Sequence, residues 1–162
     1  MRLAPLHCVD PQRARISALG HDLVRHKSGD ELLKLTRHYS IATDEVERAT
    51  PILVHGPVAA RMLYREYGLL DPEVLEGIDC HTTARANMAP VEKVLFIADK
   101  VEPEKLRYWP ECREVLDLAQ TDLDAALLRF LDLHFEQAVR KRWTIHQRSL
   151  DARNQLLLRG NR

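Results

Sequence analysis

The sequence has few cysteines, few glycines and no long apolar run. Its three cysteines, Cys8, Cys80 and Cys112, are odd in number, far apart and not arranged as C-x-x-C, which predicts reduced thiols in a cytoplasmic protein. No stretch is long and apolar enough to predict a membrane span, and the first residues do not read as a signal peptide. Only six residues are glycine and 6% are aromatic, so the Leu-, Ala-, Glu- and Arg-rich remainder favours helices.

An excess of charge of either sign is also lacking, because 24 basic residues balance 24 acidic ones. The sequence therefore predicts no nucleic-acid partner and no binding to a membrane surface. Chemistry on phosphate groups would have to rely on a local positive site, supplied by metal ions or by a few arginines. The chain is long enough for one domain with a substantial core, and we predict a single domain over residues 1–162.

Apolar residues recur at helical spacing along nearly the whole chain, and no segment alternates like a strand for long. Asp10-Pro11 and Asp71-Pro72 are typical of an N-cap followed by the first helical residue, and Ser28 and Thr43 are further candidate caps. The predicted helices cover residues 10–25, 30–38, 55–68, 71–79, 90–98, 110–119, 123–142 and 148–158, with a short polar turn at 44–49 and a loop at 106–109. The first six residues have no helix-start signal and are expected to continue an element that begins upstream. The predicted fold class is an all-α helical bundle.

Histidines and aspartates stand on several of these otherwise apolar segments. The five candidates for metal ligands are His21, Asp22, His55, His81 and Asp99. Each alone reads more simply as a solvated residue or a helix cap, but the set together is what a buried two-metal hydrolytic site requires. An aspartate beside a histidine has two oxygens with which to bridge a pair of cations. Mixed nitrogen and oxygen ligands favour iron, manganese, cobalt or nickel over magnesium.

The local contexts of these residues resemble the YqeK family of HD-domain proteins. The matching motifs are Leu19-Gly20-His21-Asp22, Leu53-Val54-His55-Gly56-Pro57-Val58, His81-Thr82-Thr83-Ala84-Arg85, Glu92 through Pro103 (EKVLFIADKVEP) and Ala152-Arg153-Asn154. The resemblance covers residues 3 to 158. It implies a helical HD-domain fold and symmetrical hydrolysis of diadenosine tetraphosphate into two ADP. It also implies two divalent metal ions, iron first, held by the five residues named above.

One departure concerns the ligand set. Members of this family carry a further ligand histidine about thirty residues before His21, and the sequence does not reach that far. We therefore expect either that the natural start lies further upstream or that the centre works with an incomplete set and fewer ions. A second departure is Lys100, which stands where the family often has an aromatic residue. Lys105 or Arg107 would supply the positive charge that follows the Glu102-Pro103 turn.

In such a site, a water bound by two cations becomes the nucleophile that attacks a phosphorus of the polyphosphate. Asp22 is the predicted bridging catalytic ligand, and Arg25 is predicted to act in catalysis and in substrate binding. Further candidates for substrate binding are Thr82, Arg85 and Lys93. Two alternatives stay open at this point: an HD-type nucleotidase acting on mononucleotides, and a non-catalytic module that binds nucleotide. The expected partner is a small nucleotide, and homodimer formation is left open.

Overall fold

The computed structural model describes residues 3–160, and within them it contains helices and no strands. The elements are α1 (Leu3–Leu6), α2 (Pro11–Gly20), α3 (Gly29–His38), α4 (Glu45–Ala49), a 3-10 turn η1 (Pro51–Val54), α5 (His55–Tyr67), α6 (Pro72–Cys80), α7 (Pro90–Lys100), α8 (Pro103–Tyr108), α9 (Cys112–Leu118), α10 (Leu123–Lys141) and α11 (Gln147–Gly160). The predicted all-α class is confirmed. Within the same residues, no helix has the length and apolar character needed to cross a membrane.

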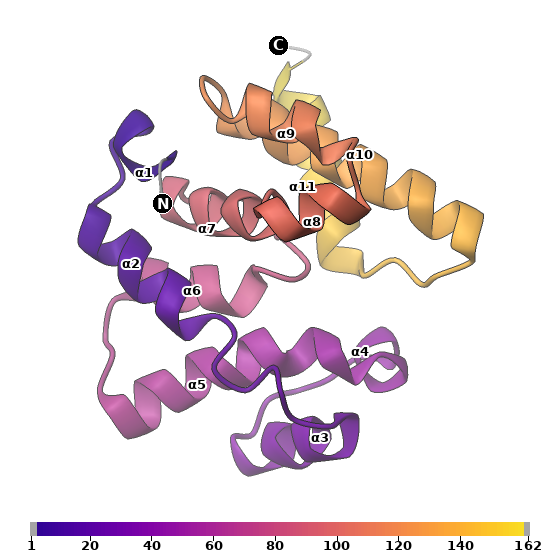
Figure 1. Cartoon of the computed structure of the whole chain (residues 1–162). Coiled ribbons are helices and arrows are strands. Elements are labelled where there is room, and N and C mark those ends of the chain that lie inside the picture. Colours follow the sequence, from indigo (N-terminus) through magenta and orange to yellow (C-terminus); the bar gives the residue numbers. More distant parts are fainter. Residues whose placement is uncertain (1–2, 161–162) are drawn as a thin grey trace.

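Two apolar clusters make up the core. One gathers side chains of α3, α5 and α6 around Leu32, Val58 and Ile78. The other gathers side chains of α7, α9, α10 and α11 around Phe96 and Leu127. Helix α7 contributes to both clusters and lies in the middle of the molecule, with α5 on one side and α10 on the other (Figure 1). The carboxyl ends of α6 and α7 therefore meet where the two halves of the core join.

The predicted helix over residues 10–25 is wrong at its end. Asp10 caps α2 as expected, since its side chain accepts from Gln12 N at 2.7 Å, but the helix stops at Gly20. Glycine is a poor helix former. Residues 21–27 continue in tighter turns, in which each of three backbone N–H groups bonds the carbonyl three residues earlier. Side chains three residues apart then lie almost in line, so Arg25 stands over Asp22 and forms an ion pair with it at 3.2 Å.

Other boundaries also differ from the sequence prediction. Asp44, not Thr43, caps α4, and it forms a capping box with Glu47. The loop predicted at residues 106–109 is wrong, because α8 begins at Pro103 and runs through Tyr108. Proline at the first helical position favours the start of a helix, and Pro103 occupies this position in α8 as Pro11 does in α2.

Candidate metal centre

The structure brings all five predicted ligands to the junction of the two core clusters. His21 immediately follows α2 and Asp22 comes next in the turn, while His55 is the first residue of α5. His81 immediately follows α6, and Asp99 lies in the last turn of α7. His55, His81 and Asp99 are buried. Because each ligand sits at or near a helix end, the packing of α2, α5, α6 and α7 alone determines how close the five side chains come.

The three histidines share one orientation. In each ring Nδ1 lies within hydrogen-bonding distance of the carbonyl oxygen three residues earlier. The distances are 2.8 Å from His21 to Ala18, 2.5 Å from His55 to Ile52 and 2.7 Å from His81 to Ile78. A carbonyl oxygen only accepts hydrogen bonds, so Nδ1 must carry the proton. When such a ring is neutral, its Nε2 lone pair faces the centre of the site, and this is the form that binds metal.

Electron-rich atoms face one another across the site. Nε2 of His55 lies 2.9 Å from Nε2 of His81 and 3.1 Å from Oδ1 of Asp22. Two lone pairs and a carboxylate oxygen at these distances repel one another unless a cation or proton lies between them. The donor set thus fits a divalent transition metal, which nitrogen and carboxylate ligands favour.

Asp22 offers a separate oxygen to each side of the centre. Its Oδ1 faces His55 and His81, while its Oδ2 lies 3.6 Å from Nε2 of His21. Nε2 of His21 lies 3.7 Å from Oδ1 of Asp99, so these two residues form the second side. A bridging role for Asp22 requires such an arrangement, and it stays a prediction.

The charges around the centre keep both aspartates ionised. Burial opposes ionisation of Asp99, but the hydrogen bond to His21 and the nearby Lys100 and Lys105 outweigh it and hold the Asp99 pKa below its usual range. Burial likewise opposes ionisation of Asp22, and its histidine neighbours and Arg25 lower its pKa nonetheless. For His55, burial lowers the pKa, which favours the neutral, metal-binding ring.

A cavity of about 480 Å³ opens beside this centre. Asp22, His55, His81 and Asp99 line it, whereas His21 lines a separate cavity behind Asp99. The charged side chains around the 480 Å³ cavity are Arg25, Lys100, Lys105 and Lys141 against Asp22 and Asp99, which is four positive and two negative. In a chain with no net charge, this local excess is the feature that attracts a polyphosphate.

The structure places the predicted substrate residues in different locations. Arg25 and Thr82 line the cavity beside the metal centre, although the Thr82 hydroxyl donates to the carbonyl of Leu53. Lys93 lies outside that cavity and pairs with Asp124. Arg85 faces a different cavity, of about 590 Å³, so neither Lys93 nor Arg85 is brought to the centre.

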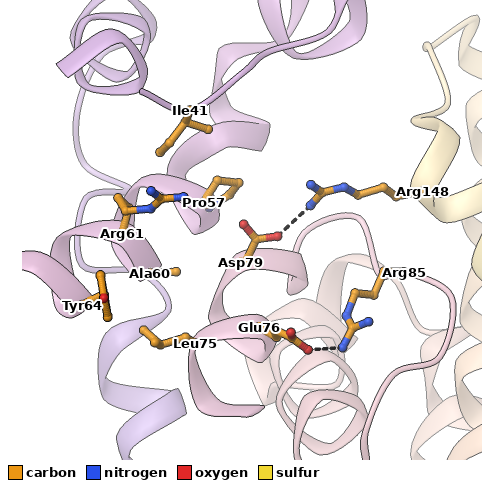
Figure 2. A pocket seen from close by; sticks show the side chains of 10 residues that line it. All are labelled: Ile41, Pro57, Ala60, Arg61, Tyr64, Leu75, Glu76, Asp79, Arg85 and Arg148. Atoms are coloured by element: carbon orange, nitrogen blue, oxygen red, sulfur yellow. Dashed lines mark hydrogen bonds and ion pairs between the residues drawn. The ribbon is translucent and has the colours of Figure 1, made fainter. Parts of the chain in front are cut away.

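Arg85 is held away from the centre by acidic partners. It pairs with Glu76 on one side and with the fully buried Glu92 on the other. In Figure 2 its guanidinium points to Glu76, while the neighbouring Arg148 points to Asp79. Sequence spacing did not reveal these pairs, because their members come from α6, α7, α11 and the loop between α6 and α7.

Other residues of the cavity carried little or no sequence signal. Lys105, one of the two candidates named for the charge after Glu102-Pro103, lines the cavity and donates to both the carboxylate and the backbone carbonyl of Asp99. The other candidate, Arg107, is exposed and lies outside it. Lys141 and Gln137 come from α10, whose helical pattern contains nothing to mark them.

A second group of potential metal ligands, Asp44, Glu47 and His146, lies between α4 and the start of α11. Nε2 of the buried His146 is 3.2 Å from Asp44 Oδ2 and 3.5 Å from Glu47 Oε1. Here, however, Nδ1 accepts the N–H of Arg148 at 3.1 Å, so the neutral ring must carry its proton on Nε2. Nε2 lies near the two carboxylates without a hydrogen bond to either, and its proton leaves no lone pair for a metal. The three residues bring the start of α4 next to the start of α11. In His146 the neutral ring carries its proton on Nε2, whereas the histidines of the main centre carry theirs on Nδ1.

Gly56 allows α5 to approach the end of α6 closely enough to bring His55 to His81. A Cβ at this position would lie 2.6 Å from Ile78 O and 2.8 Å from Asp79 O, both backbone atoms. We predict that Gly56→Ala destabilises the protein by about 1–3 kcal/mol and weakens metal binding, because α5 and α6 must separate. Thermal unfolding and metal titration measure the two effects. Gly77→Ala is the matched control, since its nearest contact would be an ordinary 3.4 Å; equal behaviour of the two variants would contradict the prediction.

The family model of the HD domain matches residues 1–104 of the chain. The matched segment contains all five converging residues. The chain therefore belongs to the HD-domain family.

Known proteins place it more closely within that family. The symmetrical bis(5'-nucleosyl)-tetraphosphatase of Halalkalibacterium halodurans is 33% identical over 96% of this chain and 82% of its own length. The Staphylococcus aureus protein of the same name is 30% identical over 95% of this chain and 79% of its own. A Clostridium acetobutylicum protein described as a predicted HD superfamily hydrolase involved in NAD metabolism, with a crystal structure at 1.50 Å, superimposes with a TM-score of 0.91. It is 30% identical, over 98% of this chain and 82% of that one. The resemblance to the YqeK family is confirmed.

Proposed function

We propose that the protein hydrolyses diadenosine tetraphosphate symmetrically, giving two ADP. The observation that carries this proposal is the convergence of three Nε2 atoms and two carboxylates beside a cavity with an excess of positive charge. Relatives at 30–33% identity bear the name of this activity. We further propose that the whole chain acts as one domain, since the core cluster around Phe96 joins the HD segment to residues beyond 104.

The proposed cofactor is a pair of divalent transition-metal ions, with iron first and manganese, cobalt or nickel as alternatives. His55, His81 and Asp22 Oδ1 would hold one ion, and His21, Asp99 and Asp22 Oδ2 the other. When bound, such ions make a water nucleophilic at neutral pH and neutralise charge on phosphate oxygens. The protein's own part is to present neutral Nε2 atoms in fixed directions, since the three backbone carbonyls leave each ring one orientation.

The side chains of the cavity bind and orient the polyphosphate. Arg25 stands over Asp22 at 3.2 Å with its guanidinium half exposed, in a position to pair with a phosphate next to the reacting one. Lys105 and Lys141 extend the positive surface along the cavity. Fixed charges of this kind stabilise negative charge that develops on phosphate oxygens and hold the chain of phosphates in line for attack.

The two alternatives from the sequence differ in what they require. A nucleotidase acting on mononucleotides would use the same centre. A non-catalytic module would not need lone pairs directed to one point, and the shared ring orientation of the three histidines speaks against it. The names of the relatives favour the dinucleotide over the mononucleotide.

Product analysis tests the proposed reaction. We expect metal-loaded protein incubated with diadenosine tetraphosphate to yield ADP as the single nucleotide product, and chelation of the metal to stop the reaction. Anion-exchange chromatography separates the products. A mixture of AMP and ATP would rule out the symmetrical cut, and faster turnover of ATP or dATP would favour the nucleotidase.

A further inference from the structure

We propose that Lys100 is a catalytic residue of this site, whose ammonium group donates a hydrogen bond to a phosphate oxygen of the bound nucleotide. The proposal rests on the proposed function, because it assigns a part of the same cavity.

Lys100 lies at the last position of α7, and its ammonium connects two ligand-bearing segments. Nζ donates to Oδ2 of Asp99 at 2.7 Å and to the backbone carbonyl of His81 at 3.0 Å. It also lies 4.9 Å from the ring centroid of Phe96 and 6.0 Å from that of Phe130. The side chain lines the cavity beside the metal centre and is 16% exposed. The ammonium is thus fixed in place at the wall of the substrate cavity.

An ammonium has three N–H donors, and these two oxygens occupy two of them. The third remains for a ligand, and an anion in the cavity is the partner of matching charge. Asp99 does not need Lys100 for charge balance, because the ammonium of Lys105 donates to the same carboxylate. Neutralising Asp99 therefore requires only the ammonium of Lys105 and does not explain why that of Lys100 is present as well.

Among the cations that line this cavity, Lys100 is better shielded from water than Arg25 and Lys105. The side chain of Arg25 is 53% exposed and that of Lys105 is 34% exposed, against 16% for Lys100. A hydrogen bond between charged groups is stronger where water is excluded, and a fixed donor needs no rearrangement when charge develops. Of the three, Lys100 is the cation placed to act on the phosphates nearest the centre.

The first experiment uses binding without turnover. ADP is titrated into metal-free wild-type and Lys100→Met protein by calorimetry, and metal content is counted separately after loading. We expect the dissociation constant for ADP to rise about tenfold in Lys100→Met, as for loss of one charge-assisted hydrogen bond, with metal content unchanged. Lys34→Met, which removes an exposed lysine of α3, should match the wild type.

Loss of metal with unchanged ADP affinity would show that Lys100 acts only through Asp99, and it would overturn the proposal. Unchanged ADP affinity with unchanged metal would overturn it as well. Lys100→Gln keeps a hydrogen-bond donor without the charge, so its dissociation constant for ADP should lie between those of wild type and Lys100→Met. This variant replaces Lys100→Met in the test if circular dichroism shows that the methionine variant does not fold.

The steady-state experiment separates this proposal from the proposed function. If wild type cleaves diadenosine tetraphosphate and Lys100→Met has the same kcat and KM, the role of Lys100 fails and the function stands. If wild type releases no ADP but Lys100→Met still binds ADP about tenfold more weakly, the function fails and the phosphate contact stands. With both correct, kcat/KM falls about tenfold or more in Lys100→Met.

Discussion

Replacing Asp22 with alanine is expected to lower kcat by about a thousandfold or more. Asp22 is the residue whose two oxygens face both sides of the centre, Oδ1 toward His55 and His81 and Oδ2 toward His21. Its loss removes a ligand from each proposed ion, and a bound metal contributes several kcal/mol to stabilising the transition state. Turnover of diadenosine tetraphosphate and metal content per chain are the two measurements.

Asp30→Ala is the matched control, because Asp30 is an exposed aspartate in the first turn of α3. It should retain wild-type turnover and metal. The prediction fails if Asp22→Ala keeps full activity, and the two-ion assignment fails if the variant keeps two ions per chain. An inactive variant that keeps both ions would mean that Asp22 acts otherwise than as a ligand.

Replacing Arg85 with methionine is expected to destabilise the protein by about 3–5 kcal/mol, the cost of leaving a buried charge without its partner. Glu92 is 0% exposed, and Arg85 donates to both of its carboxylate oxygens, at 2.9 Å and 2.6 Å. For a chain of this size that corresponds to a drop in Tm of roughly 10 °C. Since Arg85 lies outside the cavity beside the centre, KM for the nucleotide should stay unchanged in the folded fraction. Denaturant unfolding and steady-state kinetics measure the two effects.

The double variant Arg85→Met/Glu92→Met should recover most of the lost stability, because it removes the buried charge together with its partner. The loss in Arg85→Met should also depend on pH. Burial raises the pKa of Glu92 even beside Arg85, and it will raise it further without Arg85. A carboxyl whose pKa is higher in the folded state loses stability as pH rises above its unfolded value, so Arg85→Met should be closer to wild type near pH 5 than near pH 8. A loss that is equal at both pH values would contradict the buried-charge explanation.

Much of the local structure followed from residues near one another in the sequence. Asp10, Ser28 and Asp71 cap the helices they precede, and Gly68 ends α5 with a positive φ of 69°. Caps act over a single turn, so sequence neighbours are enough to predict them. The errors came where two local signals competed: Gly20 ended α2 in spite of the helical pattern beyond it, and Pro103 opened α8 where a loop was predicted.

The sequence by itself predicted the helical class, most helix starts and five candidate metal ligands, because those depend on residue type, spacing and recognisable motifs. Tertiary structure alone decided which cations line the cavity beside those five residues. Arg85 pairs with Glu92, and Lys93 pairs with Asp124. The cavity is lined instead by Lys100 of α7, Lys105 of α8 and Lys141 of α10. A long, charged side chain binds whichever opposite charge packing brings within a few ångströms, and no local pattern records that choice.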